Sequence, residues 1–337
     1  MTSLPSAAAV VRSLRAWFRR HRRDLPWREN RDPYRVWVSE IMLQQTQVER
    51  VKEFFTRFMA RFPTVAALAA AREPEVLRLW EGLGYYRRAR QLHEAARRIA
   101  GEHAGRVPES AAALQSLPGI GRYTAGAIAS IAFGAREPII EANSRRVIAR
   151  LAGHTAAVGG TGDEPLWRIA AKLVPAREPG IFNQAVMELG ALVCTPERPG
   201  CGRCPLASLC VAHRTGRVDE IPAMPPRREV KQLRETALVV RHGGRVLVER
   251  RRPGEWWEGL WDFPRASRVA GDRKIGEVVY TVTHHRVTCR VVERREPLAP
   301  PAGPGRRLVS LTTLAGLAMT APGRRIAALL TDERTGR

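Results

Sequence analysis

Apolar side chains recur at helical spacing through the first two thirds of the chain, and valine-rich segments replace this pattern in the last third. Near the N-terminus, the periodic positions predict a structural helix over 7–23 and are Val11, Leu14, Trp17 and Phe18. Residues 40–59 predict a further amphipathic helix, with Ile41, Val48, Val51, Phe54, Phe55 and Phe58 along one side. Glycine and proline interrupt the helical pattern up to about residue 215.

A change of pattern after residue 215 predicts a second domain. Residues 216–234 contain Pro222, Pro225 and Pro226 among charged residues, which predicts an exposed linker. Segments 236–240, 245–249 and 278–283 are rich in valine and threonine, as strands are, and Gly243-Gly244 predicts a hairpin turn between the first two. We therefore expect a helical domain over 1–215, a linker over 216–234 and an α/β domain over 235–337.

The net charge of the chain limits the classes of partner that it could bind. The 337 residues include 56 basic and 33 acidic side chains, a formal net charge of +23 that favours a polyanionic partner such as nucleic acid. No run of eighteen apolar residues occurs, which argues against a membrane-spanning role. The absence of an evident targeting segment leads us to expect a bacterial cytoplasmic protein, associated with the nucleoid.

Four cysteines lie close together with the spacing Cys-x6-Cys-x2-Cys-x5-Cys. They are Cys194, Cys201, Cys204 and Cys210. Thiolates this close predict one metal centre, and a single Cys-x2-Cys pair favours a 4Fe-4S cluster over a zinc ion. Disulfides are the third alternative, although no secretory signal precedes the loop. Cys289 is left over and is expected to be a small buried residue.

A glycine turn between helical segments suggests how DNA is held. In Leu117-Pro118-Gly119-Ile120-Gly121, two closely spaced glycines permit a sharp turn whose N–H groups, with the next helix start behind them, can bind a phosphate. The turn precedes the cysteine loop in a strongly basic chain, which favours a helix-hairpin-helix element over an ordinary turn.

The chain resembles the endonuclease III superfamily of helix-hairpin-helix glycosylases, and within it the MutY-type adenine DNA glycosylases. The matching segments are Trp27-Arg28, 34–37, 39–46, Gly82-Leu83-Gly84-Tyr85-Tyr86 and Phe182-Asn183-Gln184. The resemblance implies a mainly α glycosylase domain with a hairpin at about 111–133 and a 4Fe-4S loop over 194–210, followed by a smaller α/β Nudix-like domain. It also implies removal of adenine mispaired with 8-oxoguanine or guanine in double-stranded DNA by a monomer.

The resemblance assigns roles in catalysis. Glu40 would protonate the departing adenine. Desolvation of Glu40 at the start of a helix would raise the pKa of its carboxyl and keep it protonated for this step. Glu141 stands where the family has aspartate and would stabilise the oxocarbenium-like sugar. Tyr123 and Asn143 would orient these two carboxyl groups. Tyr123 occupies the position of the lysine in strand-cleaving relatives, so a monofunctional enzyme that leaves an abasic site is expected.

Further residues are assigned to DNA and base binding. Gln45, Leu83 and Tyr85 resemble the wedge that fills the gap left by a flipped base, and Gly119 and Gly121 would hold phosphate. The adenine pocket would be lined by Trp27, Arg28 and Gln184.

The last hundred residues resemble the Nudix-like domain of the same family. Nudix hydrolases need a glutamate-rich helix, and no such run follows Pro264, so a binding module is expected. Val282, Thr283 and His284 match the loop that inspects 8-oxoguanine, with the Thr283 hydroxyl retained as a hydrogen-bonding group and the aromatic ring lost at Val282.

Other functions stay open on the residues alone. A backbone-cleaving lyase is disfavoured by Tyr123, and a thymine-mismatch glycosylase is disfavoured by Glu40. An inactive damage sensor is supported only by the substitution at Glu141.

Overall fold

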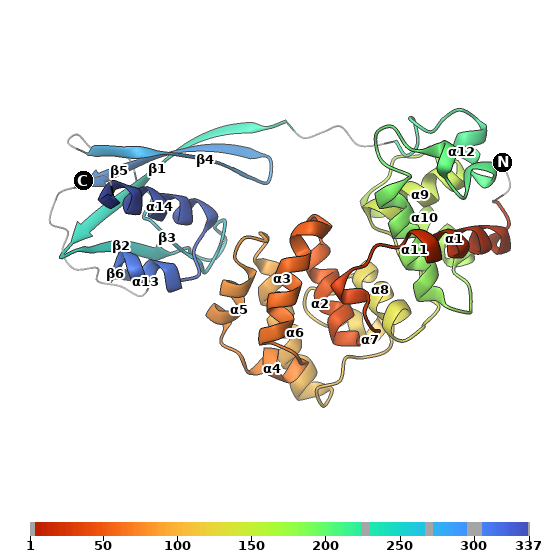
Figure 1. Cartoon of the computed structure of the whole chain (residues 1–337), viewed down its shortest axis with the longest axis horizontal. Helices are drawn as coiled ribbons and strands as arrows, with labels where there is room; N and C mark the ends of the chain where they lie inside the picture. Colours follow the sequence, from red (N-terminus) through yellow and green to blue (C-terminus); the bar gives the residue numbers. More distant parts are fainter. Residues whose placement is uncertain (1–3, 224–228, 267–271, 295–304, 336–337) are drawn as a thin grey trace. The chain divides into compact units, whose positions relative to one another are not determined.

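The contacts of the chain divide it into two compact units. The computed structural model describes residues 4–223, 229–266, 272–294 and 305–335. One unit consists of Met1–Ala70 and Gln91–Pro226, and the other of Ala71–Arg90 and Arg227–Arg337 (Figure 1). A short segment from the N-terminal half therefore belongs to the C-terminal unit.

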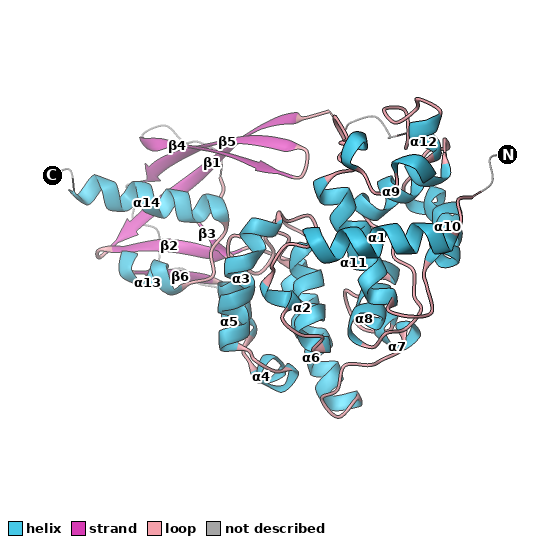
Figure 2. Cartoon of the chain, turned by 45° about the vertical axis from the view of Figure 1, so that its right-hand side comes forward, coloured by secondary structure: helices cyan, strands magenta, loops and turns pink. Residues whose placement is uncertain are grey.

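The first unit is built from helices and loops (Figure 2). Its helices are α1 (Ala7–His21), α2 (Pro33–Leu43), α3 (Val48–Arg61), α4 (Val65–Ala70), most of α6 (Arg87–Glu102), α7 (Ala111–Gln115), α8 (Arg122–Ala132), α9 (Ala142–Ala152), α10 (Glu164–Leu173), α11 (Pro179–Leu192) and α12 (Val211–Arg214). Short 3-10 turns occur at Pro26–Arg28, Gly160–Asp163, Cys201–Arg203 and Ala207–Leu209. Within the described residues of the chain, no helix is both long and apolar enough to span a bilayer.

One helix prediction is confirmed and the other is wrong. The N-terminal helix is confirmed as α1, which buries Leu14, Trp17 and Phe18 in a core shared with α11. Residues 40–59 form parts of two helices, because α2 ends at Leu43 and α3 begins at Val48. Gln45 lies between them with φ of 55°, a value that a right-handed helix does not contain. The apolar spacing continued across the break because both helices bury their apolar side chains.

The helix-hairpin-helix element is confirmed. Helices α7 and α8 are joined by a turn in which Gly119 has φ of 77°. A Cβ atom at Gly119 would lie 2.7 Å from Cβ of Gln91, so the turn needs glycine for both its conformation and its packing. Helix α8 begins directly after Gly121, which leaves the first N–H groups of the helix at the turn.

The second unit is an α/β domain. Its elements are α5 (Glu73–Trp80), β1 (Lys231–His242), β2 (Arg245–Arg250), β3 (Trp261–Asp262), β4 (Arg273–Val282), β5 (His285–Arg294), β6 (Arg306–Val309), α13 (Leu311–Gly316) and α14 (Ala321–Thr335). The strand order is β3-β2-β1-β5-β4, with β6 paired to β2. Strands β1 and β5 run parallel, and the other pairs are antiparallel.

The predicted strands 236–240 and 245–249 are confirmed within β1 and β2, and 278–283 is confirmed in β4 except for Thr283, which follows the end of that strand. The predicted hairpin is also confirmed, since Gly243 and Gly244 have φ values of 53° and 73° and join antiparallel strands. Cys289 is fully buried in the core of this domain, as expected, and burial raises the pKa of its thiol to about 11.

The predicted linker over 216–234 is exposed along most of its described length, but two parts of it are not linker. Ile221 is buried in the core of the first unit, and its carbonyl oxygen accepts a hydrogen bond of 2.8 Å from Arg150 Nε. Residues from Lys231 onward form β1. Of the remainder, 224–228, with Pro225 and Pro226, lie outside the described residues.

Candidate active site

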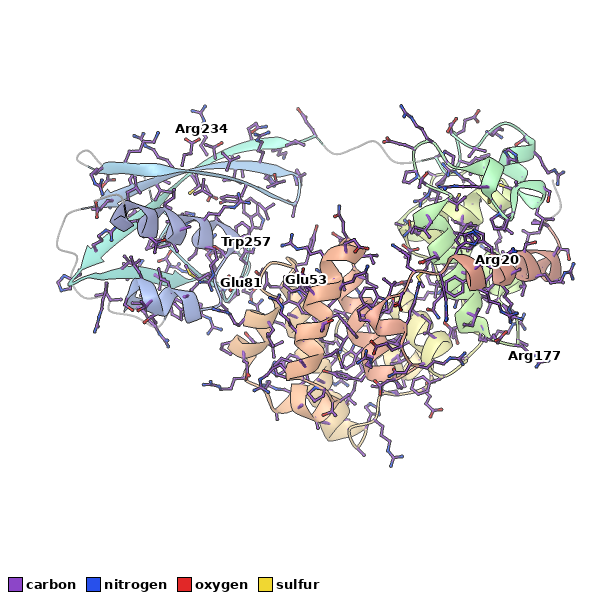
Figure 3. The ribbon with its side chains drawn as sticks, viewed as in Figure 1. Arg20, Glu53, Glu81, Arg177, Arg234 and Trp257 are labelled. Carbon is purple, nitrogen blue, oxygen red and sulfur yellow. The ribbon has the colours of Figure 1, made fainter. Side chains whose placement is uncertain are left out.

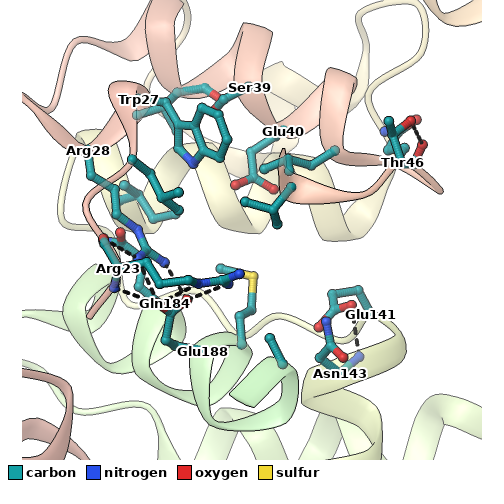
Figure 4. A pocket seen from close by; sticks show the side chains of 18 of the residues that line it. Arg23, Trp27, Arg28, Ser39, Glu40, Thr46, Glu141, Asn143, Gln184 and Glu188 are labelled. Carbon is teal, nitrogen blue, oxygen red and sulfur yellow. Dashed lines mark hydrogen bonds and ion pairs between the residues drawn. The ribbon is translucent and has the colours of Figure 1, made fainter. Parts of the chain in front are cut away.

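A single cavity of about 490 Å³ in the first unit is lined by the predicted acid, the predicted cation-stabilising group and the predicted adenine-binding residues (Figure 4). Glu40 projects from α2, and Glu141 lies at the start of α9 on the opposite wall. The sequence-predicted residues that line it are Trp27, Arg28, Glu40, Gln45, Tyr123, Glu141, Asn143 and Gln184.

Glu40 is almost completely buried, with 5% of its surface exposed. Desolvation is the main cause that raises the pKa of its carboxyl to about 7, and the nearby Glu141 carboxylate acts in the same direction. The expected position at the start of a helix is wrong, because Glu40 lies in the last turn of α2. Since the C-terminal end of a helix disfavours negative charge, this position also favours the neutral acid.

Tyr123 holds the carboxyl of Glu40 in place. The phenol oxygen lies 2.6 Å from Glu40 Oε2, to which it donates a hydrogen bond. Burial and the neighbouring carboxyls of Glu40 and Glu141 raise the pKa of Tyr123 above its ordinary value, so the group remains a donor. With Oε2 acting as the acceptor, Oε1 is the oxygen left to carry the proton of neutral Glu40.

Glu141 caps helix α9. Its Oε2 accepts a hydrogen bond of 2.8 Å from the backbone N–H of Asn143, and its Oε1 accepts one of 2.7 Å from that of Ser144. The Ser144 hydroxyl oxygen in turn accepts from the Glu141 backbone N–H, which completes a capping box. Two N–H donors and the helix dipole therefore stabilise a negative charge at the pocket wall.

Asn143 forms its hydrogen bond to Glu141 through the backbone and not through the side chain. It is Asn143's backbone N–H that binds Glu141, whereas its Oδ1 accepts a hydrogen bond of 2.8 Å from Arg146 Nη2. Arg146 also donates to the carbonyl oxygens of Gly190 and Cys194. With Oδ1 thus engaged, the NH2 group of Asn143 is the part left to donate toward the cavity.

Sequence reasoning missed an ion-paired carboxylate in the pocket. Glu188 of α11 is 1% exposed and accepts hydrogen bonds from the side chains of both Arg23 and Arg28. These hydrogen bonds and charges outweigh desolvation and lower the pKa of Glu188 to about 2. The sequence signal that could have revealed Glu188 is a single glutamate in an otherwise apolar part of α11, close to Gln184, which matches the glycosylase family. The lining thus includes two cations and an anion in fixed positions.

Trp27 forms an aromatic wall of the cavity. It is 7% exposed and meets Phe55 edge to face, with ring centroids 5.6 Å apart. Gln184 is held by a hydrogen bond of 3.3 Å from its Nε2 to the carbonyl oxygen of Gly180. A flat aromatic wall beside fixed polar groups suits a nucleobase.

The predicted wedge residues divide between the two units. Gln45 is exposed at the break between α2 and α3. In the second unit, Tyr85 is half exposed with φ of 49°, whereas Leu83 is only 6% exposed. Tyr85 is therefore available to an external partner, and Leu83 is mainly packed inside.

The four loop cysteines line one small cavity of the first unit, together with Arg150 and His213. Arg150 Nη1 lies 3.4 Å from Sγ of Cys194 and donates at 2.7 Å to the carbonyl oxygen of Thr195. Within the described ranges, no three His, Cys, Asp or Glu side chains are grouped as ligands of a metal ion. The four cysteines nevertheless border the same cavity.

The predicted recognition residues lie at the β4–β5 hairpin of the second unit. Thr283 has φ of 53°, an uncommon value for a β-branched residue, and its hydroxyl lies 3.3 Å from His285 Nδ1. The ring centroids of His284 and His285 are 4.0 Å apart. Backbone strain of this kind is frequent at binding sites.

Comparison with known proteins identifies the family. Residues 38–175 match the HhH-GPD superfamily of base excision DNA repair proteins, and residues 236–329 match the NUDIX domain. An adenine DNA glycosylase of Mycolicibacterium smegmatis is 44% identical, over 69% of this chain and 78% of that protein. The chain belongs to the adenine DNA glycosylase family.

Other members of the superfamily match different shares of the chain. The adenine DNA glycosylase of Rattus norvegicus is 43% identical over 79% of this chain, which spans about half of that protein, 53%. A solved thermostable thymine-DNA glycosylase is 31% identical, with a TM-score of 0.55, over 62% of this chain and 97% of that one. Family membership thus confirms the helix-hairpin-helix and Nudix-like fold expected from the sequence.

The contact between Glu40 and Tyr123 leads to a pH prediction. If only neutral Glu40 supports base release, the single-turnover rate of the wild-type protein should fall about tenfold per pH unit above pH 7. The Tyr123 hydrogen bond lowers the pKa of Glu40. In Tyr123→Phe, this decline should therefore begin at a higher pH, alongside a lower maximal rate. A decline that begins at the same pH in both proteins would contradict this role.

Proposed function

We propose that the chain is a monofunctional adenine DNA glycosylase. It hydrolyses the N-glycosidic bond of adenine mispaired with 8-oxoguanine or guanine and leaves an abasic site. The observation that carries the proposal is a buried carboxyl, Glu40, whose raised pKa and hydrogen bond from Tyr123 suit a general acid. Glu141 faces it across the same cavity.

Glu40 supplies a proton to the leaving base. Adenine departs poorly as an anion, so protonation of the ring must accompany cleavage of the bond. Oε1, which carries the proton while Oε2 accepts from Tyr123, is the donating atom. Trp27 provides a flat apolar wall for the base, and Arg28, held in place by Glu188, provides a donor for its edge.

Glu141 stabilises the sugar cation. The carboxylate is held by two N–H groups at the start of α9, so its charge is in place before the reaction begins. The NH2 group of Asn143 lies beside it, fixed through Arg146. Water then adds to the cation, or to a transient covalent sugar ester of Glu141, and completes the hydrolysis.

Among its described lining residues, the cavity lacks the amine nucleophile that strand cleavage through a Schiff base requires. Such a step needs an amine at the reacting sugar. The corresponding position holds Tyr123, and no lysine is among the described residues that line the cavity. The product is therefore an abasic site in an otherwise intact strand.

The DNA partner is a duplex that contains the mispair, bound by a monomer and, in the cell, part of the nucleoid. Backbone N–H groups at Gly119 and Gly121, with the start of α8 behind them, bind phosphate. Gln45 of the first unit and Tyr85 of the second are each candidates to fill space left by an extruded base. Thr283 and His284 offer hydrogen-bonding groups to the opposite base.

The cysteine loop suits a 4Fe-4S cluster. Cys194, Cys201, Cys204 and Cys210 provide four sulfur donors around one cavity, the donor set that such clusters take. When bound, the cluster cross-links the loop through its cysteines, and Arg150 and Arg146 connect the loop to α9.

Metal analysis tests the cofactor. Purified protein should contain iron and acid-labile sulfide in equal amounts, without stoichiometric zinc. Cys204→Ser should lose both iron and sulfide, whereas Cys289→Ser should retain both, because Cys289 is buried in the other unit. Stoichiometric zinc without sulfide would identify a zinc site instead.

Thymine removal is the second candidate, favoured by the 31% identity with the thymine-DNA glycosylase. Thymine can depart as a stabilised anion and has less need of an acid, so a buried Glu40 of raised pKa argues for adenine.

Single-turnover base release separates these candidates. With enzyme in excess, adenine should be released fastest opposite 8-oxoguanine, more slowly opposite guanine, and thymine should not be released opposite guanine. Glu40→Gln should abolish release because the acid is lost. Glu141→Asp should accelerate release while preserving the helix cap, since aspartate is a preferred N-cap residue. Release of thymine, or of no base by protein with an intact cofactor, would contradict the proposal.

A further inference from the structure

The segment Ala71–Arg90 belongs to the glycosylase match in sequence but to the C-terminal unit in its contacts. The HhH-GPD match spans residues 38–175 without interruption, whereas Ala71–Arg90 is grouped with Arg227–Arg337. This segment contains α5 and the turn Glu81–Tyr86, which we call the wedge turn. The segment that carries Tyr85 is therefore in contact with the C-terminal domain.

The main contact is an ion pair between Glu81 and Arg324. Arg324 Nη2 donates to Glu81 Oε2 at 3.0 Å, and its Nε donates to Glu81 Oε1. The backbone N–H of Met319 also lies 3.4 Å from Oε2. The side chains are 17% exposed for Glu81 and 27% for Arg324, so water screens the pair only partly. Figure 3 labels Glu81.

Arg324 is itself fixed by the C-terminal domain. Its Nη1 donates at 2.6 Å to the carbonyl oxygen of Leu314, and its Nη2 donates to that of Leu317. Arg78 of α5 makes a parallel contact, with Nη1 3.2 Å from the same Leu317 carbonyl. Arg78 of the segment and Arg324 of the C-terminal domain thus donate to the same carbonyl oxygen, that of Leu317, at the end of α13.

A second contact lies at the other end of the segment. Arg90 pairs with Glu73 at 3.5 Å and with Glu258 at 3.9 Å. Gly259 has φ of 76°, and a Cβ atom there would lie 2.5 Å from Arg90 Nη2. The glycine therefore permits the close approach of the guanidinium group.

The wedge turn has left-handed backbone conformations and is stabilised by hydrogen bonds from neighbouring side chains. Gly82, Gly84 and Tyr85 have φ values of 108°, 77° and 49°. Trp80 Nε1 and Arg88 Nη2 both donate to the carbonyl oxygen of Gly84, at 3.1 and 3.2 Å. The turn is thus a stiff unit that presents the half-exposed Tyr85, and its first residue is the anchored Glu81.

We propose that Glu81 and Arg324 are positioning residues that dock the wedge turn on the C-terminal domain, so that the domain reading the opposite base controls insertion of Tyr85. The proposal rests on the adenine glycosylase function proposed above. Neither residue lines the catalytic cavity. Loss of their contact should therefore weaken discrimination between opposite bases more than it weakens cleavage itself.

A double-mutant cycle with a physical readout tests the docking. Glu81→Gln and Arg324→Gln remove the charges at little change in size. Each should accelerate hydrogen exchange at the amides of Leu83 and Arg88, by about tenfold, and the double variant should show no further acceleration. Arg325→Gln is the matched control, because Arg325 is exposed on the same helix and donates to Val279 in β4. Unchanged exchange, or additive effects, would overturn the docking.

Base release in the full-length variants tests the control of insertion. The ratio of the rates for adenine opposite 8-oxoguanine and opposite guanine should fall equally in both single variants and in the double variant, and it should be preserved in Arg325→Gln. A preserved ratio despite faster exchange would overturn the coupling. If wild-type protein releases no adenine, the proposed function fails, and hydrogen exchange still decides whether the turn is docked.

Discussion

Exclusion of water from the Glu40 carboxyl is the constraint on which the proposed chemistry depends. A glutamate in solution is ionised at neutral pH and cannot act as an acid. Here the last turn of α2 places the carboxyl against the phenol of Tyr123 from α8 and across the cavity from Glu141, the N-cap of α9. Side chains from three helices, α2, α8 and α9, are thus required to keep one proton in place.

Helix α9 connects the two chemical centres of the first unit. Its N-terminal cap is Glu141, and Asn143 follows in the first turn. Farther along, Arg146 and Arg150 are buried and donate to the carbonyl oxygens of Cys194 and Thr195. Arginine suits this role because its planar group can satisfy several acceptors at once. The cysteine loop and the catalytic cavity therefore share one rigid support, so a change in either can affect the other.

Local patterns predicted much of the fold. Helix α1, the glycine hairpin and the Gly243-Gly244 turn depend on residues that are near one another in sequence, and each was predicted from them. The division at Gln45 was not predictable from apolar spacing, because helices on both sides of the turn bury their apolar side chains in the same way. The packing of Ile221 at the supposed linker depends on distant Arg150.

In the candidate site too, local sequence patterns predicted residues but not the contacts that they make with distant residues. Sequence motifs indicated Glu40, Tyr123 and Glu141. They did not predict the capping box at Glu141 or the position of Glu40 in the last turn of a helix. Glu188 was missed because its role arises from Arg23 and Arg28, which are about 160 residues away. The grouping of Ala71–Arg90 with the C-terminal domain was likewise invisible, since contacts such as that of Glu81 with Arg324 join residues far apart in sequence.

Infrared difference spectroscopy of wild type against Glu40→Gln tests most directly whether Glu40 is a neutral acid near physiological pH. The account predicts a carbonyl band of a protonated carboxyl group that is present at pH 6, is absent from Glu40→Gln, and disappears with a midpoint near pH 7. Absence of that band at pH 6, with the carboxylate bands of Glu40 already present, would contradict the account.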